Sequence, residues 1–199
     1  MPSTPPPLFT LSAWIDESLI IDSRDVPDTY MMAAVVADQD DCEDLRATML
    51  DLVVRPGVRL HWVAESAKRR DLIAHQISTL DIAAIVAIGA PMDRSRQERA
   101  RRCCLECLLY ELDKFGVSRV WLESRAAAQD RRDLRLVDSA RYKGLISREL
   151  SVDFAQPVQE PMVWLPDAVA GAVAAARRGE PRWLLMLSES VDVREVRVR

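Results

Sequence analysis

The fold is decided at the front of the chain by LFTLSAWIDESLIIDSRDVPDTYMMAAVVA, residues 8–37. Its first part, Leu8–Ile15, alternates between two kinds of side chain, which predicts a strand with one face in the core. Its last part, Tyr30–Ala37, is almost uniformly apolar and predicts a strand that is buried on both faces. Between them, Asp22–Asp28 is polar and contains a proline, which is typical of a turn. We therefore expect the two strands to pair as an antiparallel β-hairpin.

Helical and strand-like segments alternate through the rest of the chain. We expect short strands or extended segments at residues 59–63, 82–88, 117–122 and 147–153, and helices at 40–54, 66–80, 93–115, 131–145 and 161–178. Ser66 is a plausible N-cap, and Gly116 is a plausible C-terminal cap. Residues 183–187 and 191–198 are expected to form either a last strand or a packed tail. A hairpin followed by such units predicts an α/β fold with a mixed sheet flanked by helices.

Composition is that of an ordinary water-soluble domain. The chain has 199 residues, of which 49% are hydrophobic and 29% are charged. We expect a disordered, proline-rich lead-in at residues 1–7 and a single domain at 8–199. No uncharged apolar run approaches the roughly 20 residues that a membrane helix needs, and the start does not resemble a signal peptide. We therefore expect a cytoplasmic protein without a membrane partner.

Charge is unevenly distributed along the chain. The formal net charge of -4 argues against strong nonspecific binding to nucleic acid. Arginine is nevertheless abundant between residues 94 and 102 and between residues 131 and 135. Guanidinium groups suit phosphates, but arginines at helical spacing also commonly lie on solvated faces. Both interpretations stay open.

Four acidic residues stand at boundaries of the expected elements. Asp16 and Glu17 follow the first strand, Glu123 follows the strand at 117–122, and Asp167 precedes a helix of small residues. Acids contributed by strand ends and a helix start can converge on one site, and Mg²⁺ and Mn²⁺ prefer such oxygen ligands. The alternatives are a polar turn, an acid paired with a nearby arginine, and an acid that favours the helix dipole.

His61 and Glu65 form a second pair of interest, in the segment Leu60–Glu65. A histidine close to a carboxylate can act as a base, a phosphate contact or a metal ligand. The alternative is a partly buried histidine whose hydrogen bond is structural.

These motifs occur in an order that resembles a known family. The segment Trp14–Ser18, the Leu-His pair with Glu65, the strand ending at Glu123 and the helix start at 167–172 are similar to the uncharacterised bacterial family called domain of unknown function 3800. That family is regarded as similar to ribonuclease H-like nucleases and integrases. The resemblance covers roughly residues 8–173 and implies a ribonuclease H-like fold.

The resemblance also implies an activity, a metal-dependent nuclease or phosphodiesterase. It implies that Asp16, Glu123 and Asp167 hold one or two Mg²⁺ or Mn²⁺ ions, that Glu17 is an adjacent ligand or orienting group, and that His61 and Glu65 line the same cleft. Arginines from the two clusters would then hold nucleic-acid phosphates.

Two departures from the family pattern lead to alternatives. Leu19 stands where the family has glycine, and Pro166 stands where it usually has alanine. Either change is compatible with a divergent enzyme or with a catalytically inactive protein that binds a partner protein or nucleic acid. A homodimeric scaffold, formed through the helix at 161–178 or the one at 93–115, is a third hypothesis.

Overall fold

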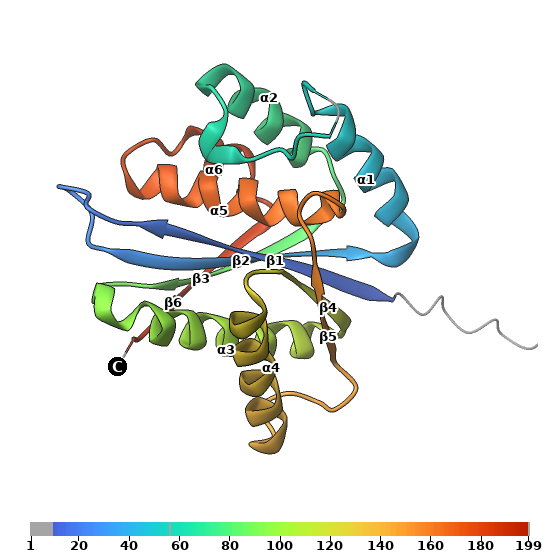
Figure 1. Ribbon diagram of the computed structural model, residues 1–199. Helices are drawn as coiled ribbons and strands as arrows, with labels where there is room; N and C mark the ends of the chain where they lie inside the picture. The colour runs from blue at the N-terminus through green and yellow to red at the C-terminus, as the bar shows by residue number, and fades with distance from the viewer. Residues whose placement is uncertain (1–9, 56, 199) are drawn as a thin grey trace, which may run out of the picture.

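The computed structural model describes residues 10–55 and 57–198, and within them six strands form one mixed sheet. The strand order is β5-β4-β1-β2-β3-β6 (Figure 1). The strands are β1 (Leu11–Ile20), β2 (Thr29–Asp38), β3 (Ala83–Gly89), β4 (Val117–Glu123), β5 (Ser151–Ala155) and β6 (Val191–Val196). The expected hairpin is confirmed, because β1 and β2 pair antiparallel along their whole length.

The first strand is longer than the sequence predicts. It was expected to end at Ile15, but it continues to Ile20, where it pairs with Thr29. Asp16 therefore lies inside the strand and not at its end. The polar run Asp16–Ser18 does not interrupt the strand because the hydrogen bonds to the fully buried β2 continue on either side of it.

The two neighbours of β1 differ in how far they follow it. On one side β2 accompanies the strand to its end. On the other side β4 runs parallel to it only from Leu11 to Ile15. Beyond Ile15, β4 no longer pairs with β1. The second half of β1 therefore borders an opening next to the end of β4.

Helices cover both faces of the sheet (Figure 1). One layer contains α5 (Trp164–Arg177), which packs on β1 and β2, together with α1 (Cys42–Asp51), α2 (Ala67–Ser78) and α6 (Arg182–Met186). The other layer contains α3 (Gln97–Phe115) and α4 (Ala127–Tyr142). Two buried clusters, one on each face, form the core.

Local signals located two helix ends correctly, whereas α4 (Ala127–Tyr142) begins and ends earlier than the expected range 131–145. Ser66 caps α2 by accepting a hydrogen bond from the Arg69 backbone N–H, and Gly116 ends α3 with φ at 88°. Residues 59–63 do not form a strand, because Trp62–Ala64 is a 3₁₀ helix. The end of the chain supplies both a short helix, α6, and an edge strand, β6, parallel to β3.

Two further expectations concern the lead-in at the start of the chain and membrane-spanning helices. The lead-in at residues 1–7 lies outside the described residues. Among the helices of the described part, none has the length and apolar character required to cross a bilayer.

Candidate functional site

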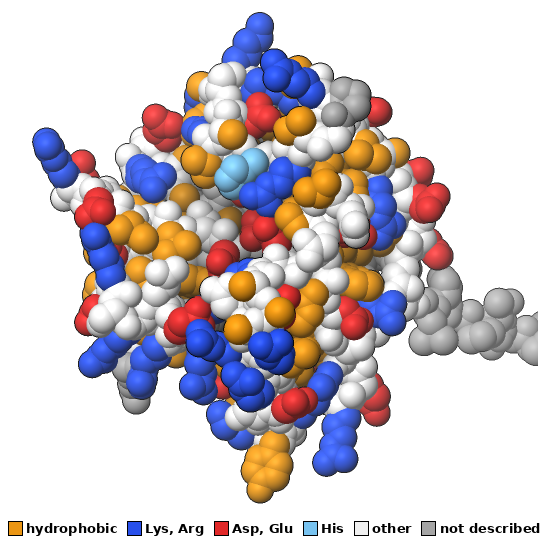
Figure 2. Space-filling model, in the orientation of Figure 1, with side chains coloured by type: hydrophobic (Ala, Val, Ile, Leu, Met, Phe, Trp, Pro, Cys, Tyr) orange, Lys and Arg blue, Asp and Glu red, His pale blue; other side chains and the backbone are white. Residues whose placement is uncertain are grey.

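A cleft of about 250 Å³ opens where β4 leaves β1. Its walls come from β1, from the end of β4 and from the segment that precedes α2, and its lining includes acidic, basic and apolar side chains. The lining residues are Ile15, Asp16, Glu17, Leu19, Met32, Arg59, His61, Arg101, Glu123 and Arg125. Figure 2 shows acidic side chains set in a hollow between the layer with α5 and the layer with α3 and α4.

Asp16 and Glu123 are neighbours in the sheet. Leu122 is the partner of Ile15 in the parallel register, so the next residue of each strand is Glu123 and Asp16. Alternation along the strands places both carboxylates on the face that α5 covers, where Trp14 and Trp121 also pack. Adjacent strands lie about 4.8 Å apart, so these two acids lie side by side.

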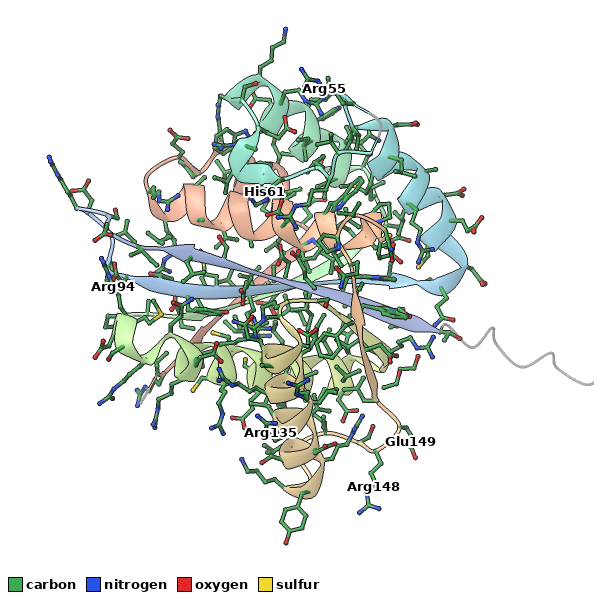
Figure 3. All side chains as sticks on the ribbon, in the orientation of Figure 1. Arg55, His61, Arg94, Arg135, Arg148 and Glu149 are labelled. Atoms are coloured by element: carbon green, nitrogen blue, oxygen red, sulfur yellow. The ribbon has the colours of Figure 1, made fainter. Side chains whose placement is uncertain are left out.

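Asp167 approaches the same face from above. It lies in the first turn of α5, the helix that packs on β1. Its carboxylate accepts a hydrogen bond of 2.7 Å from the Trp62 backbone N–H and lies 3.3 Å from Nδ1 of His61, which lines the cleft. Figure 3 shows His61 on the α5 side of the sheet.

Gly171 explains why this segment can lie so close to α5. A Cβ atom on Gly171, one turn after Asp167, would overlap the indole ring of Trp62. The missing side chain lets Trp62 pack directly on the helix, and this contact holds the Trp62 N–H and His61 against the Asp167 carboxylate.

The three carboxylates influence one another electrostatically. The pKa of Asp16 is raised well above its ordinary value, first by burial and then by the negative charges of Glu123 and Asp167. Burial disfavours a lone carboxylate, and nearby like charges disfavour it further. Among the described residues no cation pairs with Asp16, which accepts only the Glu17 backbone N–H, at 2.7 Å.

The other two acids each have a basic neighbour. Nη1 of Arg59 lies 3.0 Å from Oε1 of Glu123. The hydrogen bond to Asp167 raises the pKa of His61. Within residues 10–55 and 57–198, no three acidic, histidine or cysteine side chains stand close enough together to enclose a metal ion.

Glu17 belongs to the opposite face of β1. It contacts the guanidinium of Arg101 and the hydroxyl of Tyr30. Arg101 also binds Asp133 with two hydrogen bonds, of 3.1 and 2.8 Å, and Asp133 accepts a third from Arg125, at 3.1 Å. Glu17 is therefore neutralised by a network on the α3 side, although it lines the same cleft as Asp16 and Glu123.

Glu65 is placed away from this cleft. Its carboxylate pairs with Arg69, one helical turn later, and it does not contribute to the cleft lining. Among the charged residues that line the cleft, Arg59 and Arg125 were not predicted to be site residues. Each stands two residues from a residue that was, Arg59 before His61 and Arg125 after Glu123, and this proximity is the only signal that the sequence offers.

The small-residue helix α5 does not provide a surface for a second copy of the chain. Its residues from Ala168 to Ala175 are buried by β1, β2 and the surrounding helices. The scaffold hypothesis therefore cannot rely on this helix.

Comparison with known proteins bears on the fold. No protein-family model matches the chain, and no curated protein matches it either. Among solved structures, the chain is similar to RNase HII from Archaeoglobus fulgidus, solved in complex with PCNA. The TM-score is 0.51 at 16% sequence identity, and the match covers 87% of this chain and 76% of that chain. A likeness at this identity shows the fold alone, and it confirms that the chain has a ribonuclease H-like fold.

Proposed function

We propose that the protein is a metal-dependent phosphodiesterase that acts on nucleic acid. The observation that carries this proposal is the grouping of Asp16, Glu123 and Asp167 at one end of the β1–β4 pairing, with Asp16 lacking any cation among the described residues. Glu123 and Asp167 each have a basic neighbour, so it is the unpaired Asp16 beside them that favours a bound cation. The ribonuclease H-like fold supports the same reaction class by analogy.

The donor set suits Mg²⁺ or Mn²⁺. All three groups offer hard oxygen ligands, which these ions prefer. Mg²⁺ usually takes only one or two protein carboxylates and keeps several waters or substrate oxygens. The described residues contain no three closely grouped metal ligands. This is compatible with an ion held by Asp16 and Glu123, with Asp167 close by. A bound ion would supply Lewis-acid stabilisation of the charge on the phosphate.

The protein's own side chains would position the substrate. Arg59 and Arg125 line the cleft from opposite layers and can donate to phosphate oxygens. His61 has its Nδ1 against Asp167, which fixes the orientation of the ring in the cleft wall. Ile15, Leu19 and Met32 add an apolar surface, which restricts water around the reacting phosphate.

We also propose that the chain is a divergent member of the family called domain of unknown function 3800. The proposal rests on the order of its motifs, from Trp14–Ser18 to the start of α5. In the structure Leu19 lies in a regular strand, paired with Tyr30, so its position does not require the conformational freedom of glycine. Pro166 occupies the first turn of α5, where proline is tolerated.

The test is nuclease activity in the Asp16→Asn variant. Wild-type protein should cleave single-stranded or hybrid oligonucleotides with added Mg²⁺ or Mn²⁺ and should not cleave them in EDTA. Asp16→Asn should lower the rate by at least about 100-fold, the scale expected for a group that stabilises the transition state electrostatically. Asp25→Asn, which removes a charge from the exposed hairpin turn, is the matched control. A wild-type protein that neither cleaves nor binds either metal would refute the proposal.

A second function, binding without catalysis, has its own observation in its favour. Glu123 is paired with Arg59, and Asp167 is engaged by the Trp62 N–H and His61. If these contacts persist when nucleic acid binds, two of the three acids are not free to ligate a metal. This alternative predicts nucleic-acid affinity that survives the triple change Asp16→Asn, Glu123→Gln and Asp167→Asn, with no cleavage by the wild type.

A further inference from the structure

A second hollow lies between α3 and α4, on the side of the sheet away from α5. Its volume is about 430 Å³, and three of its lining residues are arginines: Arg102 from α3, and Arg132 and Arg135 from α4. Figure 2 shows basic side chains gathered over these two helices, and Figure 3 places Arg135 on α4, across the sheet from His61. We call this hollow the α3–α4 groove.

The arginines of the groove are unpaired within the described part of the chain. Arg102, Arg132 and Arg135 are exposed and form no ion pair or hydrogen bond with any residue that the structure describes. This sets them apart from Arg94, which is paired with Asp22 and Asp28, and from Arg101, which is buried between Glu17 and Asp133.

The acids in the groove do not cancel this charge. Asp133 is buried and already neutralised by Arg101 and Arg125. Glu98 is half exposed and lies 3.6 Å from Nη1 of Arg125. The groove therefore carries positive charge in a protein whose net charge is -4, and the general charge of the chain does not account for it.

The groove adjoins the cleft. Arg125 lines the cleft, and it contacts both Glu98 and Asp133, which line the groove. Arg101 likewise lines the cleft and binds Asp133. The two hollows are thus separated by a single layer of ion-paired side chains. A chain of phosphates with one member in the cleft would place its neighbours along the groove.

We propose that the α3–α4 groove binds the phosphate backbone of the nucleic-acid strand whose reacting phosphate lies in the cleft. This inference rests on the proposed function for the choice of ligand, but it concerns affinity and not the chemical step. The occupant is a phosphodiester backbone, because three arginines spread along one hollow match repeated phosphate groups.

The experiment measures binding without metal, so that cleavage plays no part. Fluorescein-labelled 20-nucleotide DNA, RNA and an RNA–DNA hybrid of one sequence are titrated in EDTA, at several salt concentrations, with wild-type protein and with Arg102→Ala/Arg132→Ala/Arg135→Ala. The triple variant should bind at least about tenfold more weakly, and its slope of log K against log salt should fall by about 2 to 3, since each phosphate contact contributes about 0.7–0.9. The three substrates separate preference for DNA from preference for RNA.

Two further variants keep the test decisive. The triple lysine variant at the same positions should retain most of the salt slope, because it keeps the charge. Arg24→Ala/Arg55→Ala/Arg178→Ala removes the same charge from exposed positions outside the groove and should leave affinity within about twofold. Thermal melting checks that each variant is folded.

The outcomes separate this inference from the proposed function. Equal affinity in the groove variant and the wild type, or no binding of any substrate, would overturn the groove assignment, and cleavage by that variant at the wild-type rate would leave the proposed function standing. Loss of binding in the groove variant, together with a wild type that never cleaves, would support the groove and refute the nuclease.

Discussion

Asp16 and Glu17 are adjacent in β1, but their side chains lie on opposite faces of the sheet and have opposite electrostatic environments. On the α5 face, Asp16 stands beside Glu123 and near Asp167, and its pKa is raised because burial and these charges disfavour its ionised form. On the α3 face, Glu17 is surrounded by donors, Arg101 and Tyr30, and Arg101 is itself paired with Asp133. One face concentrates negative charge, and the other neutralises it.

This difference in charge neutralisation indicates that Asp16 and Glu17 have separate roles. A folded protein usually pairs its buried charges, as the Glu17 face does. A buried acid without a counter-charge, as Asp16 is among the described residues, costs stability and commonly marks a functional site. The contrast leads to four predictions, in which charge neutralisation on the Glu17 face stabilises the fold and charge accumulation on the Asp16 face weakens it.

The largest effect is expected from Arg101→Met. The change leaves Glu17 and Asp133 without their shared cation, and the side chains of Arg101 and Asp133 are only 4% and 7% exposed. Breaking a buried ion pair from one side costs about 3–5 kcal/mol of unfolding free energy, which urea denaturation would measure. Arg102→Met, on the next residue, is exposed and unpaired in the described structure and should change stability by less than about 0.5 kcal/mol. Equal effects of the two substitutions would show that the network is not structural.

A smaller loss is expected from Gly171→Ala, which tests how the Asp16 face is assembled. The new methyl group would overlap the Trp62 indole and push it away from α5. Overpacking of this kind typically costs about 1–3 kcal/mol. Because Trp62 also donates its backbone N–H to Asp167, nuclease activity should fall along with thermal stability. Ala172→Gly, the neighbouring change, removes a methyl group instead and should leave the Trp62 contact in place. Unchanged activity in Gly171→Ala would separate Asp167 from this packing.

Asp16→Asn should stabilise the protein, by about 1 kcal/mol, the usual size of a favourable single substitution. The folded state raises the pKa of Asp16 above its value of 3.8 in the unfolded chain, so the unfolded state releases this proton more readily as pH rises. The wild type therefore loses stability from about pH 4 up to the raised pKa, and Asn removes that loss.

The pH dependence distinguishes this explanation from a general change in net charge. The gain in Asp16→Asn should grow as pH rises from about 4 toward the raised pKa of Asp16, and it should vanish below about pH 4, where Asp16 is protonated in both states. Asp25→Asn, in the exposed hairpin turn, should show no such profile. A destabilised Asp16→Asn at pH 7 would mean that the carboxylate is compensated in a way that the structure does not show.

Part of this contrast could be predicted from the sequence. The ends of α2 and α3 follow from Ser66 and Gly116, because caps are local signals. Period-two alternation places residues 16 and 17 on opposite faces as soon as both are known to lie in a strand. The sequence interpretation instead ended the strand at Ile15, since three polar residues in succession are typical of a turn, and only the register with β2 shows that the strand continues.

The partners of these acids could not be predicted in this way. Arg101 is 84 residues from Glu17 and 32 residues from Asp133 in the chain. Helical periodicity places Arg101 on the apolar face of α3 with Leu105 and Leu108, but it does not identify the acids that Arg101 meets there. The pairing of Arg59 with Glu123 likewise spans 64 residues. The order of the acidic motifs indicates which acids are candidates for the site, but tertiary structure decides which of them are neutralised.

The smallest stability effect, and the sharpest test of the site, is expected from Arg59→Gln. Arg59 and Glu123 are 35% and 21% exposed, so the loss of their ion pair should change the unfolding free energy by less than about 1 kcal/mol. The metal affinity of the wild type distinguishes the two functions proposed, and the variant should bind metal more tightly under both. If Arg59 holds Glu123 until a cation replaces it, Arg59→Gln removes the competitor, and the Mg²⁺ or Mn²⁺ concentration for half-maximal binding, measured by calorimetry, should fall severalfold. If the ion pair permanently blocks a noncatalytic site, the variant should gain a metal affinity that the wild type lacks.

Arg69→Gln, which breaks the comparable pair with Glu65 away from the cleft, should leave metal binding unchanged. No change of metal affinity in Arg59→Gln would show that the charge accumulated on the Asp16 face is not a cation site at all.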